Sequence, residues 1–241
     1  MKKSIILQTP THNIELISNG KEEFENIIIC FHGFNGDKWG DAYSALKYTI
    51  ENSLVCSFDS CGHGKSEISS ENMRLDLILE EINVVVNFLK NNFADKPIIL
   101  VAGSYGAYRV MEYLIKYKPD IKKVIYINPA FRILSILEKV KDFKYSELKE
   151  TDLIPMKQSL NKYIKKDFLD DLYTNDLYKT DFNITYESYI IIGKKDDLIP
   201  INDTLEIAKR FDYPLFYVDD THCFENKDNY NIVINIIKEA I

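Results

Sequence analysis

The chain has few of the residues that mark special classes of protein: four cysteines, nine glycines, seven prolines and one tryptophan among 241 residues. The cysteines show no CxxC spacing, so we expect free thiols in a reducing, cytoplasmic compartment and neither a disulfide framework nor a zinc site. No apolar run is long enough for a signal-peptide core or a membrane span, which excludes a membrane partner from our expectations. Glycine and proline form no linker.

Positively charged residues are fewer than negatively charged ones. The sequence has 30 lysines and arginines against 37 acidic residues, a net charge of −7, and no long basic run. An acidic chain repels phosphate backbones, so nucleic acid is not expected as a partner. The length and the 46% hydrophobic content suit one domain over residues 1–241 with a sizeable core. A monomer and a homodimer both stay open.

Short, continuous apolar runs alternate with segments of helical character. Such runs are typical of strands buried on both faces of a parallel sheet. The apolar runs are 27–31, 54–58, 98–103, 124–128, 189–193 and 215–218, and the helical segments are 40–52, 71–92, 105–118, 202–211 and 227–241. The alternation predicts an α/β fold: a mostly parallel central sheet flanked by helices on both faces. An antiparallel pair is predicted before the first run, and the serines of "SSENM" are predicted to cap the helix over 71–92.

One interval, 131–179, breaks this rhythm. It contains no convincing buried strand; "FRILSILEKVKDF" and "DFLDDLYTNDLY" look helical, with Pro155 between them. We interpret the interval as a helical cap insertion that leaves from the end of a strand and covers a site. The alternative is a pair of extra helices packed on the side.

The stretch "LVAGSYGAYRV" places Ser104 between an apolar run and a helical segment. A nucleophile elbow requires this strand–turn–helix context, with small residues two positions before and after the serine. Ala102 and Gly106 meet that need, although Ala102 stands where the pattern has glycine. The alternative is a serine that only caps the helix.

A nucleophilic serine needs a base and a carboxylate that orients the base. Among the four histidines, His222 follows the last apolar run, which places it at the same sheet edge as Ser104. Asp196 follows the preceding run, with Asp197 as its alternative.

The order Ser104, Asp196, His222, each after a separate strand, is that of the α/β-hydrolases. Three further stretches resemble the same family. "CFHGFNG" resembles its oxyanion loop, "FDSCGHGKS" its Asp-x-x-Gly-His-Gly-x-Ser turn, and "GKKDDLIP" its acid loop, a match that selects Asp196. "THCF" is similar to the histidine loop of small bacterial cinnamoyl and feruloyl esterases, close to the serine-aminopeptidase and monoglyceride-lipase branches.

The resemblance implies a serine carboxylesterase that hydrolyses small esters, aromatic or short in the acyl part, through an acyl-enzyme. It implies a Ser104–His222–Asp196 triad and an oxyanion hole formed by the backbone N–H groups of Phe34 and Tyr105. It makes Asp59 and His63 structural. No metal or organic cofactor is implied, and the expected partner is a small-molecule ester.

Other functions use the same residues. An aminopeptidase would need acidic residues of the insertion for the substrate amine, and Asp170, Asp171 and Asp176 are the candidates. A thioesterase or an acyltransferase would use the same triad. A non-catalytic binding protein on this scaffold is the alternative from a different class.

Overall fold

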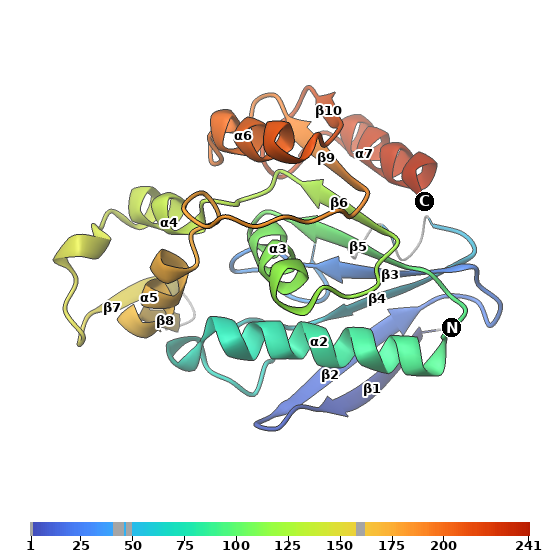
Figure 1. The fold of residues 1–241 in the computed structure, drawn as a ribbon, viewed down its shortest axis with the longest axis horizontal. Helices are drawn as coiled ribbons and strands as arrows, with labels where there is room; N and C mark the ends of the chain where they lie inside the picture. The colour runs from blue at the N-terminus through green and yellow to red at the C-terminus, as the bar shows by residue number, and fades with distance from the viewer. Residues whose placement is uncertain (1, 41–45, 47–49, 158–161) are drawn as a thin grey trace.

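The computed structural model describes residues 2–40, 46, 50–157 and 162–241. Eight strands form the central sheet in the order β1-β2-β4-β3-β5-β6-β9-β10 (Figure 1). They are β1 (Lys2–Gln8), β2 (Asn13–Asn19), β3 (Asn26–Phe31), β4 (Ser53–Phe58), β5 (Ile98–Gly103), β6 (Lys123–Ile127), β9 (Ser188–Gly193) and β10 (Leu215–Val218). β2 pairs antiparallel with β1 and β4, and all other pairs are parallel.

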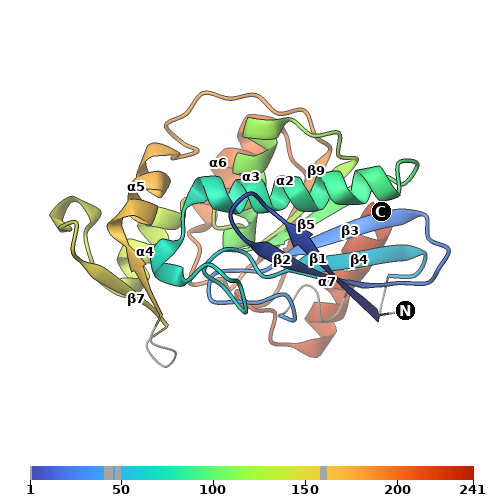
Figure 2. The ribbon, with the colours of Figure 1, turned by 90° about the horizontal axis from the view of Figure 1, so that it is seen from below.

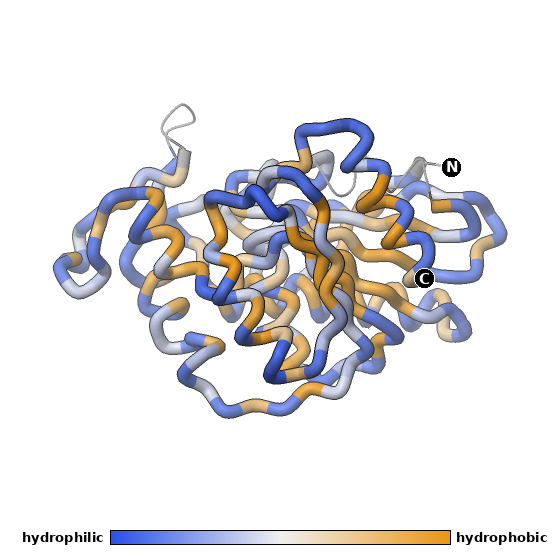
Figure 3. The backbone as a smooth tube through the Cα atoms, turned by 90° about the horizontal axis from the view of Figure 1, so that it is seen from above, coloured by the Kyte–Doolittle hydropathy of each residue, from blue (hydrophilic) through white to orange (hydrophobic). Residues whose placement is uncertain are grey.

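Side chains alternate across the sheet, so each strand contributes to two separate cores. In β3, Ile27 and Ile29 join one cluster and Ile28 joins the other. The first cluster packs against α2 (Leu75–Asn92), α3 (Tyr105–Tyr117) and α6 (Ile201–Phe211), and the second against α7 (Lys227–Ala240). Figure 2 shows α2 and α7 on opposite sides of the strands, and in Figure 3 hydrophobic segments gather between hydrophilic outer loops.

The predicted α/β fold is confirmed. All six apolar runs are strands, and the helical segments from 71 onward correspond to α2, α3, α6 and α7. The helix predicted over 40–52 falls mostly outside the described residues. None of the four cysteines, all of them described, forms a disulfide. Within the described ranges, we find no helix with the length and apolar character needed to cross a membrane.

The segment 131–179 differs from the expectation of helices alone. It contains α4 (Ile133–Lys141), the 3-10 turn η2 (Tyr145–Glu147) and α5 (Lys166–Thr174), but also an antiparallel pair, β7 (Leu153–Lys157) and β8 (Lys162–Lys165). Pro155, expected between two helices, lies in β7; proline cannot donate to the ladder, and it sits at a register shift of this pair. Figures 1 and 2 show this segment at the end of the molecule opposite both chain termini.

The start of α2 corrects a second expectation. The serines of "SSENM" belong to a separate 3-10 turn, η1 (Ser70–Asn72), and α2 begins after Arg74 with no side-chain cap of its own. Asp171 of α5 replaces it: one carboxylate oxygen accepts the Leu75 N–H at 2.9 Å. Arg74 donates to both oxygens of that carboxylate, at 2.8 and 2.9 Å. The insertion therefore caps a helix of the main fold.

Candidate active site

Ser104 lies on the turn between β5 and α3 with φ 50° and ψ −121°. This left-handed backbone conformation is strained for a residue with a side chain, and such strain gathers at functional sites. Gly106 relieves the crowding, because a Cβ there would lie 2.7 Å from the carbonyl oxygen of Phe31. Backbone hydrogen bonds tie the turn to the end of β6: the Ser104 N–H donates to Ile127 and the Ala130 N–H donates to Ser104. The turn is thus the predicted strand–turn–helix elbow.

His222 and Asp196 are joined side chain to side chain, with 2.7 Å between Nδ1 and Oδ2. The other carboxylate oxygen accepts the backbone N–H groups of Leu198 and Ile199, each at 2.9 Å. An ionised carboxylate only accepts hydrogen bonds, so Nδ1 carries the ring proton and Nε2 is the basic nitrogen. Asp197 is exposed. Asp196 is therefore the carboxylate that meets His222.

Asn128, at the end of β6, was not predicted as a site residue. It is buried, donates from Nδ2 to the carbonyl of His222 at 2.8 Å, and accepts the Gly193 N–H at 2.7 Å. It thus fastens the loop that carries His222 to the end of β9, just before the loop that carries Asp196. Its sequence signal was a polar residue at the end of a buried apolar run; in the structure it has a φ of 42°, a positive value that asparagine tolerates.

Ser104 and His222 line one cavity of about 420 Å³. Much of its apolar wall comes from two helices, and Lys141 of α4 also lines the space. The apolar lining residues of α4 are Ile133, Ile136, Leu137 and Val140, and those of α7 are Tyr230, Val233, Ile234 and Ile237. Both sets have the spacing i, i+3, i+4, i+7, so each helix presents one continuous stripe to the cavity. One stripe belongs to the insertion and the other to the main fold.

The loop after β3 passes beside Ser104: a Cβ on Gly33 would lie 3.3 Å from the serine Cβ. Phe34 lines the cavity, and Tyr105 is the first residue of α3. Among the described residues, no hydrogen-bond acceptor is found for the N–H of either Phe34 or Tyr105. Both donors are therefore available near Ser104.

His32 holds the peptide that carries the Phe34 N–H. Its Nε2 accepts the Ser60 N–H at 3.2 Å, so its proton is on Nδ1, which donates to the Gly33 carbonyl at 2.9 Å. Burial keeps the pKa of His32 well below its ordinary value, so the ring stays neutral. In a trans peptide the N–H points opposite to the C=O. Holding the Gly33 carbonyl therefore fixes the direction of the Phe34 N–H.

Comparison with known proteins shows the family of the chain. The family model described as "Serine aminopeptidase, S33" matches residues 22–184, more than half of the chain. The chain belongs to this α/β-hydrolase family. A curated relative, the proline iminopeptidase PfmaB of Pestalotiopsis fici, is 22% identical, with 89% of this chain and 91% of that protein covered.

Solved structures share the fold over nearly the whole chain. Est1E from Butyrivibrio proteoclasticus, with ferulic acid bound, superimposes with a TM-score of 0.83 at 20% identity, covering 98% of this chain and 97% of that one. A soluble variant of monoglyceride lipase from Saccharomyces cerevisiae gives 0.74 at 15% identity, covering 100% and 94%. At these identities the likeness concerns the fold.

The family name includes an aminopeptidase, which needs a binding site for the amine of its substrate. The three candidate aspartates do not form such a site at the cavity. Asp171 caps α2, as described above. Asp170 accepts hydrogen bonds from Lys166 and from the Tyr145 hydroxyl. Asp176 accepts the Tyr178 N–H and pairs with a lysine. None of the three aspartates lines the cavity of Ser104.

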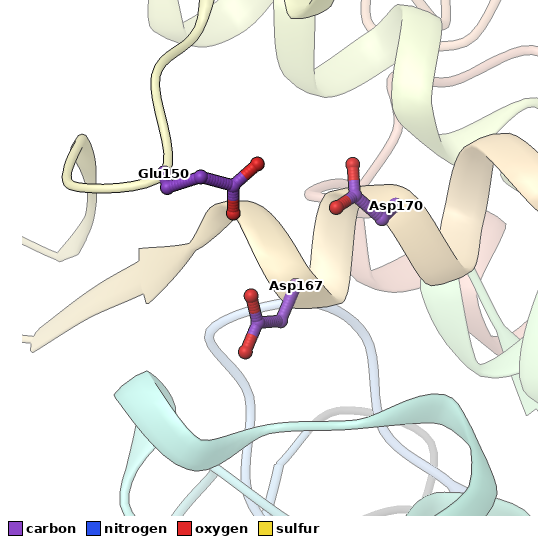
Figure 4. Close-up of side chains that lie close together, drawn as sticks. All are labelled: Glu150, Asp167 and Asp170. Atoms are coloured by element: carbon purple, nitrogen blue, oxygen red, sulfur yellow. The ribbon is translucent and has the colours of Figure 1, made fainter.

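Figure 4 shows a cluster of carboxylates at α5, with Glu150, Asp167 and Asp170 close enough to share a cation. A cation is already there: the Lys166 ammonium lies 3.3 Å from Glu150 and 2.7 Å from Asp170. The cluster is therefore neutralised in part by the protein's own lysine, and two of its three members are exposed.

Asp59 and His63 lie in the turn after β4. Asp59 accepts hydrogen bonds from the Lys38 backbone N–H at 2.7 Å, from the Lys38 ammonium at 2.5 Å and from the Lys65 backbone N–H at 2.9 Å. His63 Nδ1 donates to the Cys61 carbonyl at 2.9 Å. Burial lowers the pKa of His63 to about 3, so the ring is neutral. These contacts are those of a structural turn.

Proposed function

We propose that the protein is a serine carboxylesterase that hydrolyses small esters through Ser104, His222 and Asp196. The observation that carries the proposal is the shared cavity: Ser104 on its strained turn and His222, oriented by Asp196, line the same apolar space. Nothing in this arrangement calls for a metal or an organic cofactor.

In the proposed mechanism, His222 Nε2 takes the hydroxyl proton as Ser104 Oγ attacks the ester carbonyl carbon. The oxygen that becomes negative accepts hydrogen bonds from the N–H groups of Phe34 and Tyr105. The bond to the alcohol then breaks, and the alcohol leaves with the proton from His222. Water repeats the sequence on the acyl-enzyme, releasing the acid and restoring Ser104.

The cavity supports an uncharged, apolar substrate. The two helical stripes and Phe34 offer apolar contact, and none of the aspartates or glutamates among the described residues lines the space. Lys141 also lines it, but its ammonium donates to the Met156 carbonyl at 2.9 Å. A short acyl chain and an aromatic acid both suit about 420 Å³. Est1E, which shares the fold, has been solved with ferulic acid, and this supports including aromatic esters among the substrates tested.

An aminopeptidase is the second candidate, because the family model and the curated relative carry peptidase names. It requires a counter-charge for the substrate's amine. The paired states of Asp170, Asp171 and Asp176 count against it.

The test is hydrolysis of p-nitrophenyl butyrate by the wild type, Ser104→Ala and the control Ser135→Ala, an exposed serine on α4. We expect Ser104→Ala to lose activity by about 10³-fold or more and the control to match the wild type. In the same assay, feruloyl ester is expected to exceed prolyl p-nitroanilide and acyl-CoA in kcat/KM. A higher kcat/KM for the anilide would favour the peptidase, and a higher kcat/KM for the acyl-CoA would favour a thioesterase. Equal rates for folded wild type and Ser104→Ala would overturn the proposal.

A further inference from the structure

Arg109 is a buried cation that the proposed mechanism does not use. It lies four residues after Tyr105 on α3, with 1% of its surface exposed. Within the described part of the chain, no carboxylate lies within 4 Å of its guanidinium. Burying a charge without a counter-ion is costly. The contacts that it does make therefore indicate what it holds in place.

The guanidinium connects the two elements that carry the proposed oxyanion donors. Its Nη2 donates to the carbonyl oxygen of His32 at 2.5 Å, in the loop after β3. Its Cζ lies 4.9 Å from the centre of the Tyr105 ring, at the start of α3. Arg109 thus bridges the loop of Phe34 to the helix of Tyr105.

The side chains of the two donor residues also contact each other. The rings of Phe34 and Tyr105 meet edge to face with centroids 5.4 Å apart. His63 packs on both, at 5.5 Å from Phe34 and 5.8 Å from Tyr105. Such aromatic pairs have preferred geometries, so the cluster resists sliding of one element against the other. Arg109 closes this cluster from the α3 side.

We propose that Arg109 is a positioning residue of the oxyanion hole: it holds the His32 carbonyl against α3, so that the Phe34 and Tyr105 N–H groups converge on one point beside Ser104. The inference rests on the proposed esterase mechanism. His32 sets the direction of the Phe34 N–H, and Arg109 sets its distance from α3. Without the guanidinium, both donors persist but only the aromatic cluster holds their separation.

The experiment compares Arg109→Met with a matched control, Lys123→Met. Lys123 is also a buried cation that donates to a backbone carbonyl, that of Ala240, and it does not line the cavity of Ser104. The readouts are kcat and KM for p-nitrophenyl butyrate, and Ki for a trifluoromethyl ketone. The ketone's oxygen becomes negative when Ser104 adds to it, so its Ki reports on the oxyanion hole independently of the fraction of active enzyme.

Loss of a whole oxyanion donor costs about 10²–10³-fold in kcat, so displacement is expected to cost about 10- to 100-fold. For Arg109→Met we expect that fall in kcat, a matching rise in Ki and a KM within about twofold, because the donors act in the transition state. Arg109→Lys, which keeps a cation and a donor, is expected to fall between the wild type and Arg109→Met. Lys123→Met is expected to lose stability while keeping kcat and Ki.

A folded Arg109→Met with kcat and Ki within about threefold of the control would sink the proposal. If that variant cannot be purified, Arg109→Lys decides: a parallel change in kcat and Ki supports the positioning role, and unchanged values overturn it. A wild type inactive on every ester overturns the esterase and this inference together, whereas an active wild type with an unaffected Arg109 variant overturns this inference alone.

Discussion

At the scale of single residues, the Asp196 carboxylate divides its two oxygens between different partners. One oxygen accepts two backbone N–H groups, and the other faces Nδ1 of His222. The side chain is only 5% exposed, so water does not compete for these bonds. Because the backbone N–H groups occupy one oxygen, they determine which atom of the residue 196 side chain faces His222.

Asp196→Asn is therefore expected to abolish most activity without changing the shape of the site. The amide oxygen keeps the backbone N–H groups of Leu198 and Ile199, which turns the NH₂ group toward His222. The ring then carries its proton on Nε2 and cannot accept the proton of Ser104, so kcat should fall by about 10⁴-fold. The control is Asp197→Asn at the exposed neighbouring position; if both variants lose kcat equally, the assignment of Asp196 is wrong.

At the scale of elements, α3 begins directly after Ser104 and also carries a buried glutamate. Glu112 lies on this helix with 8% of its surface exposed. Burial raises the pKa of Glu112 to about 8, so the folded protein keeps this carboxyl protonated at neutral pH. The unfolded chain releases the proton above the ordinary value of 4.5. Stability from this group is therefore present at pH 4.5 and is lost as pH rises toward 8.

Glu112→Gln should remove that loss. We expect the free energy of unfolding in urea to increase by about 1–3 kcal/mol at pH 8 and by nothing at pH 4.5. Glu239→Gln, an exposed glutamate on α7, is the matched control and should change neither value. A destabilised Glu112→Gln at pH 8 would show that the carboxylate has a partner that stabilises its charged form.

At the scale of the whole molecule, buried histidines make stability depend on pH with two opposite signs. Burial lowers the pKa of His63 to about 3 and that of His32 well below 6.5. As pH falls through 6.5 the unfolded chain takes up these protons first, so the stability that both histidines contribute is lost as pH falls. The hydrogen bond to Glu81 raises the pKa of His12, whose contribution is complete below 6.5 and is lost as pH rises through its folded pKa.

Because the pKa of His63 is about 3, its neutral ring should cost about 2 kcal/mol of the free energy of unfolding between pH 6.5 and 4.5. His63→Asn is therefore expected to lose about 2 kcal/mol less than the wild type over that interval. His12→Gln should keep the wild-type slope there and differ instead above pH 6.5. Urea unfolding across pH checks all three proteins, and equal slopes for the wild type and His63→Asn would contradict the buried neutral ring.

Much of the architecture follows from short-range patterns. The six apolar runs became strands because continuous hydrophobic residues must be buried on both faces, and this requirement is visible within five or six positions. Ser104, Asp196 and His222 could be chosen because parallel strands end at one edge, so the residues that follow them meet. The hairpin β7–β8 was not predicted because its strands have only five and four residues, and because a proline in β7 argues against pairing.

The sequence by itself determined that the candidate catalytic residues each follow a separate strand, and that small residues permit the turn at Ser104. Both features depend on local backbone requirements. Only the tertiary structure decided the contacts of Asn128, Arg109 and Asp171. Their partners lie 94, 77 and 96 positions away, at His222, His32 and Leu75. No periodicity or motif reports such contacts, because packing between distant elements brings them together.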